Sequence, residues 1–248
     1  MIDIHAHLWL GQEDKNAADM RKAAEKFSVE AILISALGSH QPDEGEIEVL
    51  NDRCFALCRE DALFYPYVTV APEHKNAPEV LQRGIDRGAV GMKIWVSCLC
   101  DDTCCDPLYR RCAEADIPVL IHTFSKSVGQ LPQESTAVHL AAAAKRHPDT
   151  KFILAHLGGN CYHGIPMIRD EPNVYADFSG SNCRADDLPY ALEQLGAERI
   201  LFGTDMPGSF AMSWGQVLAA GLSHRELALI ASENARRLFP ALRNRHEL

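Results

Sequence analysis

The first eight residues of the chain, MIDIHAHL, contain two histidines whose spacing allows metal binding. Apolar and polar residues alternate here as in a β-strand, so Asp3, His5 and His7 share one face. Two imidazoles two residues apart on a rigid strand can bind one divalent cation. The alternative is a half-buried strand in which these histidines only form local hydrogen bonds.

Four more side chains with acid–base or ligand chemistry occur further along the chain. They are Lys93, His122, His156 and Asp205. Each lies at or near the carboxyl end of an apolar, β-rich segment, in GMKIW, VLIHT, ILAHL and LFGTD respectively. Such regular placement is not expected of unrelated core histidines. Whether these groups can act together depends on how the segments are arranged.

Eight segments have the composition of buried β-strands, and they alternate with segments of helical periodicity. The predicted strands are 1–8, 29–37, 63–70, 88–96, 118–123, 151–157, 174–179 and 199–204. The predicted helices are 16–27, 46–59, 78–87, 107–115, 135–147, 162–169, 186–195 and one or two within 216–238. This alternation predicts a parallel sheet, and eight units predict an α/β fold, the (β/α)8 TIM barrel, as a single domain over residues 1–248. The alternative is a doubly wound open sheet, but no GxGxxG motif follows the first strand.

In such a barrel the carboxyl ends of all strands open at one mouth, where catalytic groups lie. His5 and His7 are near the end of the first predicted strand, and the four side chains above follow the fourth, fifth, sixth and eighth strands. The barrel therefore predicts that all six side chains meet at one site.

The motifs DIHAH, GMKIW, VLIHT, ILAHLGG and LFGTDMP together resemble those of the amidohydrolase superfamily. More narrowly, residues 2 to about 238 are similar to its amidohydrolase-related branch, which includes aminocarboxymuconate-semialdehyde decarboxylase and related hydrolases. The resemblance implies a metal ion bound by His5, His7, His122 and Asp205, with His156 beside a metal-bound water. It also implies one ion rather than two.

The donor types agree with that expectation. Three neutral imidazoles and a carboxylate suit Zn²⁺, with Mn²⁺ or Fe²⁺ as alternatives, and leave a position for water or substrate. Water bound to Zn²⁺ has a pKa of about 7, which provides a hydroxide near neutral pH. Asp205 can take the proton of that water, and His156 can hydrogen-bond to the hydroxide or the developing oxyanion. We therefore expect a metal-dependent hydrolase that attacks a C–N or C–O bond of a small molecule, with Asp205 and His156 as catalytic residues.

Two other functions are compatible with the same residues. A metal-dependent non-oxidative decarboxylase would use the same ligands, but it also needs cationic groups that hold a carboxylate. Only residues 9–28 separate the first two predicted strands, so the arginine contacts that the branch carries in a longer insertion have no counterpart there. A barrel that binds metal or ligand without turnover is the third alternative.

Three further residues are expected near the substrate. Lys93 can orient a substrate carboxylate or, if it is carboxylated as in some members of the superfamily, bridge a second metal ion. His163 lies shortly after the Gly158-Gly159 pair, and Trp95 lies in the loop after the fourth strand. Both are candidates for substrate contact because loops at this end of a barrel carry specificity.

The sequence contains nine cysteines, an odd number in a chain too long to need disulfides for its stability. Six of them fall in loops on the catalytic side of the predicted barrel: Cys98, Cys100, Cys104, Cys105, Cys161 and Cys183. They can form a second, thiolate metal site, but CLCDDTCC lacks the paired CxxC spacing of a zinc ribbon. Free thiols lining a lid over the site are therefore the prediction.

The net charge of −10 and the pI near 5.5 argue against a nucleic-acid-binding protein, which needs a basic surface. No apolar run approaches the roughly 18 residues of a membrane span, and no leader peptide precedes the first predicted strand. These features predict a cytoplasmic enzyme with a small-molecule substrate and with no nucleic-acid or membrane partner. A homo-oligomer is compatible with them.

Overall fold

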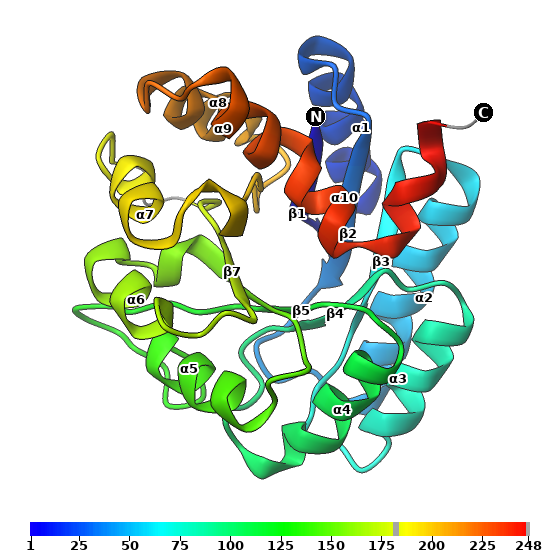
Figure 1. Ribbon diagram of the computed structural model, residues 1–248. Helices are drawn as coiled ribbons and strands as arrows, with labels where there is room; N and C mark the ends of the chain where they lie inside the picture. The colour runs from blue at the N-terminus through cyan, green and yellow to red at the C-terminus, as the bar shows by residue number, and fades with distance from the viewer. Residues whose placement is uncertain (181–183, 247–248) are drawn as a thin grey trace.

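Eight parallel strands form a nearly closed barrel in the computed structural model, which describes residues 1–180 and 184–246 (Figure 1). The strands are β1 (Ile2–Trp9), β2 (Ala31–Leu37), β3 (Phe64–Thr69), β4 (Gly91–Ile94), β5 (Val119–Ile121), β6 (Phe152–Leu154), β7 (Val174–Asp177) and β8 (Ile200–Leu201). Each is paired with the next in chain order. The first and last strands meet at a seam, where the Ile4 N–H donates to the Phe202 carbonyl at 3.0 Å and Ala6 pairs with Asp205 in an isolated bridge. The predicted (β/α)8 TIM barrel is confirmed.

The helices surround the barrel on its outside (Figure 1). They are α1 (Glu13–Phe27), α2 (Glu44–Glu60), α3 (Ala77–Asp86), α4 (Asp106–Glu114), α5 (Ala137–Arg146), α6 (Cys161–Ile168), α7 (Asp187–Leu195), α8 (Phe210–Ala219), α9 (His224–Ala228) and α10 (Asn234–Leu238). Five short turns of other helical types complete the chain: η1 (Thr103–Cys105), η2 (Ala155–Gly158), η3 (Ala197–Arg199), η4 (Leu229–Glu233) and η5 (Pro240–His246). Among the described residues, no helix is long and apolar enough to cross a membrane.

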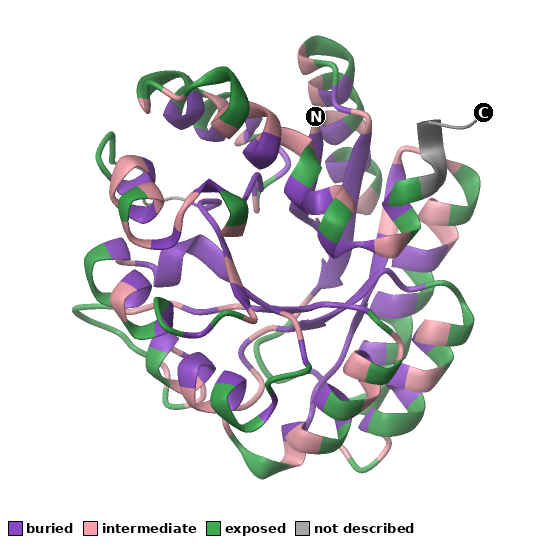
Figure 2. Cartoon of the chain, viewed as in Figure 1, coloured by how far each residue is buried: buried purple, intermediate pink, exposed green. Residues whose placement is uncertain are grey.

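Two layers of buried apolar side chains stabilise this arrangement, and the strands are buried along most of their length (Figure 2). Strand residues that point outward, such as Ile32 and Val68, pack under the helices. Residues that point inward, such as Ile4 and Leu33, fill the barrel itself. Because alternate strand residues point to opposite faces, near-continuous apolar strands can supply both layers. Each such side chain contributes roughly 1.5–3 kcal/mol when it is fully buried.

Tyr67 is one of the largest fully buried side chains of the barrel interior. Its hydroxyl donates to the Ile4 carbonyl at 2.8 Å, so the buried polar end of the ring is satisfied. Gly91 on the neighbouring strand leaves the space for this ring, since a Cβ atom at Gly91 would lie 2.6 Å from it. The polar groups at the mouth of the barrel therefore lie directly above a layer of packed apolar side chains.

Strand ends differ from the sequence prediction where the site begins. The sixth predicted strand, 151–157, ends as β6 at Leu154, although its apolar run continues. Pairing with β7 stops there, and the chain then turns sharply with positive φ at His156 (60°) and Leu157 (48°). Asp205, just beyond β8, also has a positive φ of 65°. Side chains in such sparsely populated backbone conformations are often functional.

The carboxyl-terminal helices also differ from the prediction. The first of them, α8, begins at Phe210 rather than at residue 216. The remainder is divided into α9 and α10 by a π-helical turn at Leu229–Glu233. Such π-helical turns are rare and occur mostly as single turns inside α-helices, so a prediction based on the α-helical period does not include them.

Candidate metal centre

The two histidines of β1 lie side by side at the mouth of the barrel. Their Nε2 atoms are 2.9 Å apart, and both side chains are buried. Each Nδ1 atom faces an oxygen on a neighbouring element: His5 faces Asp177 Oδ2 at 2.9 Å, and His7 faces Ser35 Oγ at 2.8 Å. These outer contacts fix the orientation of both rings, as is usual for imidazoles that bind metals.

The hydrogen bonds of Asp177 determine which nitrogen of His5 is free. Its Oδ1 accepts from the backbone N–H groups of His156 at 3.2 Å and Ser179 at 2.9 Å. The other oxygen of the carboxylate accepts the proton on His5 Nδ1, which leaves His5 Nε2 with a lone pair and no hydrogen. That lone pair points at His7 Nε2, so it must receive a proton from a neighbour or a cation.

Asp205 completes a group of three ligand-type side chains. Its Oδ1 is 3.3 Å from His7 Nε2 and 3.7 Å from His5 Nε2. The ligand atoms of His5, His7 and Asp205 all lie within 4.8 Å of one another. The Asp205 N–H donates to the His5 carbonyl at 2.6 Å, so the carboxylate is held against the histidine strand.

The protonation states of this group suit a cation. Burial lowers the pKa values of both His5 and His7, so both imidazoles are neutral. Burial alone would raise the pKa of Asp205, but the neighbouring His156 and the hydrogen bond from His7 hold it well below its usual range. Neutral imidazoles and a carboxylate are the forms that bind a divalent metal ion.

Lys93, at the end of β4, also points into the mouth. Its Nζ atom lies 3.2 Å from His5 Nε2, and the side chain is buried. Burial lowers its pKa to about 8, an effect opposed by the charges of Asp205 and Asp177. The structure thus places Lys93 in contact with the histidine pair, as the barrel predicts.

His122 and His156 form a second pair beside the first. His122 Nδ1 lies 3.2 Å from His156 Nε2, and His122 Nε2 lies 3.1 Å from Glu134 Oε1. Burial lowers the pKa of His122 to about 4, and hydrogen bonds from His122 and Lys126 lower that of Glu134 to about 2 although burial opposes them. His156 Nδ1 is 3.0 Å from Ser179 Oγ.

The two pairs touch but do not merge into one ligand group. The rings of His5 and His156 are 5.0 Å apart between centroids, and His5, His156 and Asp177 form their own cluster of ligand-type atoms. His122 belongs to neither of the histidine-containing clusters among the described residues. Its role as a metal ligand stays a prediction, as do those of the other expected ligands.

Asp3 and Gly203 hold the seam under the site. Asp3 accepts from the Thr204 hydroxyl at 2.7 Å and from the His5 N–H at 3.1 Å. Burial raises the pKa of Asp3 to about 7, while these hydrogen bonds oppose the shift. A Cβ atom at Gly203 would lie 2.9 Å from that of His5, so a glycine is needed for the close approach of β8. The carboxylate of Asp3 thus ties the strands together from below.

A sequence profile of the amidohydrolase family matches residues 2–241. The chain belongs to the amidohydrolase family. The resemblance carried by its five motifs is thereby confirmed. Comparison with the curated proteins gives no match.

Several solved structures share the fold of this amidohydrolase. A 2,6-dihydroxybenzoate decarboxylase from Rhizobium superposes with a TM-score of 0.78 at 21% sequence identity, covering 97% of this chain and 98% of that one. A dihydroxybenzoic acid decarboxylase from Polaromonas sp. JS666, with bound manganese and the inhibitor 2-nitroresorcinol, has a TM-score of 0.76 at 18% identity, covering 96% of both chains. A 4-oxalomesaconate hydratase from Rhodopseudomonas palustris has a TM-score of 0.70 at 17% identity, covering 98% of this chain and 96% of that one.

A cavity that contains the cationic side chains of Lys126 and Arg184, here called the basic cavity, lies next to His122 and His156. It has a volume of about 550 Å³, and its lining includes Phe124, Lys126, Arg184 and Asp187. The Phe124 ring forms the border with the site, because its centroid is 6.1 Å from that of His122 and 6.0 Å from that of His156. The cavity therefore adjoins the second histidine pair.

Two of the expected substrate-binding residues lie elsewhere. Trp95 is half-buried directly after β4, and its ring centroid is 5.6 Å from that of Trp9 and 4.7 Å from that of His40. His163 is exposed on α6 and lines another cavity, of about 260 Å³, together with Tyr162 and Met167. Contact of Trp95 or His163 with a substrate stays a prediction.

Three residues that contact the histidines of the site were not predicted from the sequence. Asp177 ends β7, so the rule that selected the other strand-end residues applies to it equally well. Ser35 lies within the apolar run of β2, where nothing in the sequence marks it as a histidine partner. Glu134 lies in the long segment between β5 and α5, where no periodicity indicates its position.

Proposed function

We propose that this amidohydrolase is a metal-dependent decarboxylase that releases carbon dioxide from a small carboxylated aromatic or enol acid. The observation that carries the proposal is the basic cavity, which contains Lys126 and Arg184 and which the Phe124 ring separates from His122 and His156. The sequence favours a hydrolase because the arginine contacts of related decarboxylases have no counterpart after β1. Cationic side chains from two other loops offer a substitute for them.

The comparisons support the same choice. Two of the solved structures with this fold are decarboxylases of dihydroxybenzoates, and one of these holds manganese. The third is a hydratase, which also acts on a small carboxylic acid. The hydrolase predicted first from the sequence has less support, and it becomes an outcome of the test below.

The residues present fit a divalent cation. His5 Nε2 offers a lone pair to the space that it shares with His7 and Asp205. We assign these three residues as ligands, with His122 as the fourth predicted one. When bound, such a cation would neutralise and polarise an oxygen of the substrate. Zn²⁺, Mn²⁺ and Fe²⁺ all suit nitrogen and oxygen donors, and one ion is proposed.

The reaction then needs two further tasks from the protein. Arg184 would bind and orient the substrate from the cavity side, whereas Lys126, which is paired with Glu134 Oε1 at 2.7 Å, would add its charge to the same cavity. The bond from carbon to the carboxylate breaks, its electron pair stays on the carbon, and a proton takes the place of the lost carbon dioxide. We assign the delivery of that proton to His156, whose Nδ1 is fixed against Ser179.

The proposal is tested by measuring carbon dioxide. The protein loaded with Zn²⁺ or Mn²⁺ is incubated with hydroxylated benzoates and enol acids, and in parallel with lactones and cyclic amides. We expect carbon dioxide from at least one acid and no release by the Asp205→Asn variant. Hydrolysis of a lactone or amide without carbon dioxide from any acid would overturn the proposal in favour of the hydrolase. Full activity of Asp205→Asn would overturn the role given to that carboxylate.

A further inference from the structure

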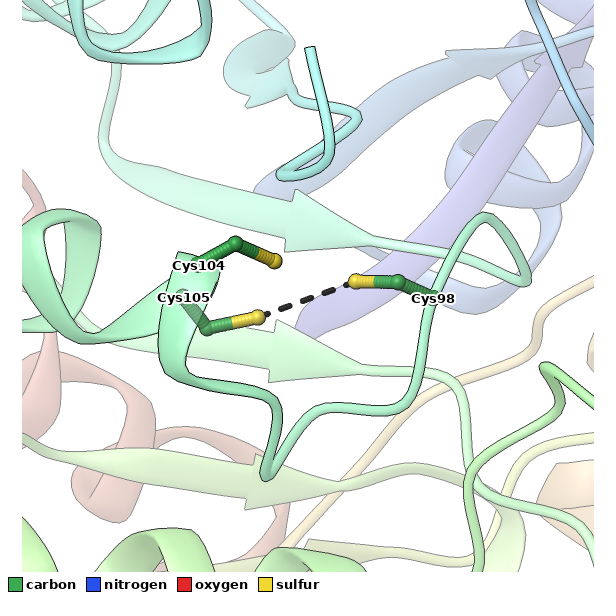
Figure 3. A group of neighbouring side chains, drawn as sticks. All are labelled: Cys98, Cys104 and Cys105. Atoms are coloured by element: carbon green, nitrogen blue, oxygen red, sulfur yellow. Dashed lines mark hydrogen bonds between the residues drawn. The ribbon is translucent and has the colours of Figure 1, made fainter. Parts of the chain in front are cut away.

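Three thiols that the sequence scatters over a loop lie together in the structure. Cys98 is in the loop after β4, while Cys104 and Cys105 are in the η1 turn before α4. Figure 3 shows their sulfur atoms directed towards one another. Cys98 Sγ and Cys105 Sγ are 3.7 Å apart, and all three sulfur atoms lie within 4.8 Å of one another. All eight described cysteines are free thiols, and Cys183 lies outside the described residues.

We propose that Cys98, Cys104 and Cys105, which we call the sulfur cluster, form a binding site for a thiophilic d10 cation such as Zn²⁺ or Cu⁺. Thiolates select such ions over Mg²⁺, Ca²⁺ or Mn²⁺. This site is separate from the histidine centre in ligands and in chemistry, and it does not depend on the reaction proposed above.

The sulfur positions fit a single ion. Zinc–sulfur bonds are about 2.3 Å long, so sulfur ligands lie about 3.8 Å apart in a tetrahedral site and about 4.0 Å apart in a trigonal one. The Cys98–Cys105 separation of 3.7 Å is close to the tetrahedral value, and the limit of 4.8 Å on the other two separations is compatible with both arrangements. An ion can therefore be bound with only small movements of the side chains.

The loop between these ligands is held in place from both sides. The carboxylate of Asp102 accepts from the Cys104 N–H at 3.1 Å and caps η1. The Cys100 N–H donates to Ser135 Oγ at 2.9 Å, and its carbonyl accepts from the Tyr109 hydroxyl at 2.6 Å. A loop that is already ordered loses little conformational entropy when it binds an ion.

An ion can reach the sulfur cluster from solvent. Cys105 is fully buried, but Cys98 and Cys104 are half-buried. Water can therefore provide a fourth ligand for Zn²⁺, whereas Cu⁺ is satisfied by three thiolates. Partial exposure also reduces the cost of holding three negative sulfurs around one cation.

The position of the sulfur cluster indicates what a bound ion would do. Trp95 lies three residues before Cys98, and its ring packs against Trp9. The Trp9 ring is 6.2 Å from that of His7. An ion that links Cys98 to η1 would thus fix the part of the mouth that carries Trp95. We assign it a structural role.

The test uses Cd²⁺ as a spectroscopic probe, because thiolate ligands, unlike imidazoles and carboxylates, give an intense ultraviolet charge-transfer band with this ion. The full chain is reduced, freed of metal and titrated. We expect the band to saturate at one Cd²⁺ per chain. It should disappear in the Cys98→Ser/Cys104→Ser/Cys105→Ser variant and persist in Cys58→Ser, a half-buried cysteine on α2 that serves as the control.

A second measurement needs no substitution and therefore stands even if the triple variant does not fold. The wild-type chain is alkylated with and without Zn²⁺, and the modified cysteines are mapped by peptide mass. Free Zn²⁺ at ~10 times its Kd should slow modification of the sulfur cluster about tenfold and leave Cys58 unchanged. The thiols could instead serve only as small apolar side chains. Absence of the Cd²⁺ band, its survival in the triple variant, or equal alkylation with and without Zn²⁺ would overturn the proposal.

Discussion

The histidine pair of β1 is held by strands of the barrel, whereas the sulfur cluster and the basic cavity are held by loops. His5 and His7 each have one nitrogen fixed by a side chain of another strand, Asp177 of β7 for His5 and Ser35 of β2 for His7, and β1 pairs with β2 on both sides of a register shift between Asp3 and Ala6. The loop-held groups depend on caps and on isolated side-chain contacts. The strands therefore position the side chains expected to react, whereas the loops determine which ligand binds and shape the mouth of the barrel.

Removing the strand-held pair is expected to have the largest effect. The His5→Ala/His7→Ala variant loses two of the assigned ligands, so elemental analysis should find no stoichiometric ion at the histidine centre. Carbon dioxide release should fall by about 10³-fold or more, since even one lost stabilising group costs 10²–10³-fold.

The exposed His224 at the start of α9 provides the control, and His224→Ala should keep both metal and activity. The Cd²⁺ band of the sulfur cluster should survive in the double variant. Loss of that band together with the histidine centre would show that the two regions are not independent.

Asp177→Ala should give the next largest effect. We regard Asp177 as a positioning residue, because it contacts His5, one of the proposed ligands, and not the proposed ion itself. Loss of such a contact typically weakens metal binding 10–100-fold. Competition with a chelator measures the change, and Asp177→Asn, which keeps an acceptor for His5, should recover part of the affinity. Equal metal affinity of the wild type and Asp177→Ala would contradict the view that this strand residue positions His5.

Arg184→Ala tests the basic cavity. Because the guanidinium is placed to bind the substrate rather than to react, we expect KM to rise about tenfold, as for one lost hydrogen bond to a charged group, with little change in kcat. Steady-state kinetics with the best acid of the panel would show this. The exposed Arg225 on α9 offers a matched control. A large fall in kcat at unchanged KM would instead place Arg184 in the chemical step.

The smallest effect is expected at the loop cap. Asp102→Ala removes the acceptor that caps η1, a change worth about 1 kcal/mol. Such a loss corresponds to roughly fivefold weaker Cd²⁺ binding at the sulfur cluster. Titration of the charge-transfer band measures it, and metal content at the histidine centre should not change. A loss of more than about a hundredfold would mean that this loop is not ordered without its cap.

The sequence was sufficient to predict the barrel because the same pattern of one strand followed by one helix occurs eight times. Near-continuous apolar strands alternate with amphipathic helices, and a boundary error in one unit leaves the topology unchanged. The boundaries themselves depend on where sheet pairing stops. Before and after His156 the apolar pattern continues beyond Leu154, the last paired residue of β6. The sharp turn that orients the His156 side chain could therefore not be predicted from the amino-acid composition.

The positions of candidate site residues could be predicted from the sequence where these residues lie at the ends of strands. The strand-end rule brought Lys93 and Asp205 to the histidine pair, and it would also have found Asp177. The position of Glu134 beside His122 could not be predicted, because Glu134 lies in a long loop without periodicity. A thiolate site in this loop was the less favoured interpretation of the sequence, because the proximity of Cys98, Cys104 and Cys105 arises from the η1 turn and not from a metal-binding spacing.

The seam between β1 and β8 has a consequence for how the protein is made. The Ile4–Phe202 and Asp3–Thr204 hydrogen bonds join residues that are about two hundred positions apart. During synthesis the imidazoles of the first strand therefore leave the ribosome long before the carboxylate that accompanies them. A nascent chain that ends before Asp205 would lack one of the three proposed ligands, so we expect tight binding of an ion only after the last strand has joined the first.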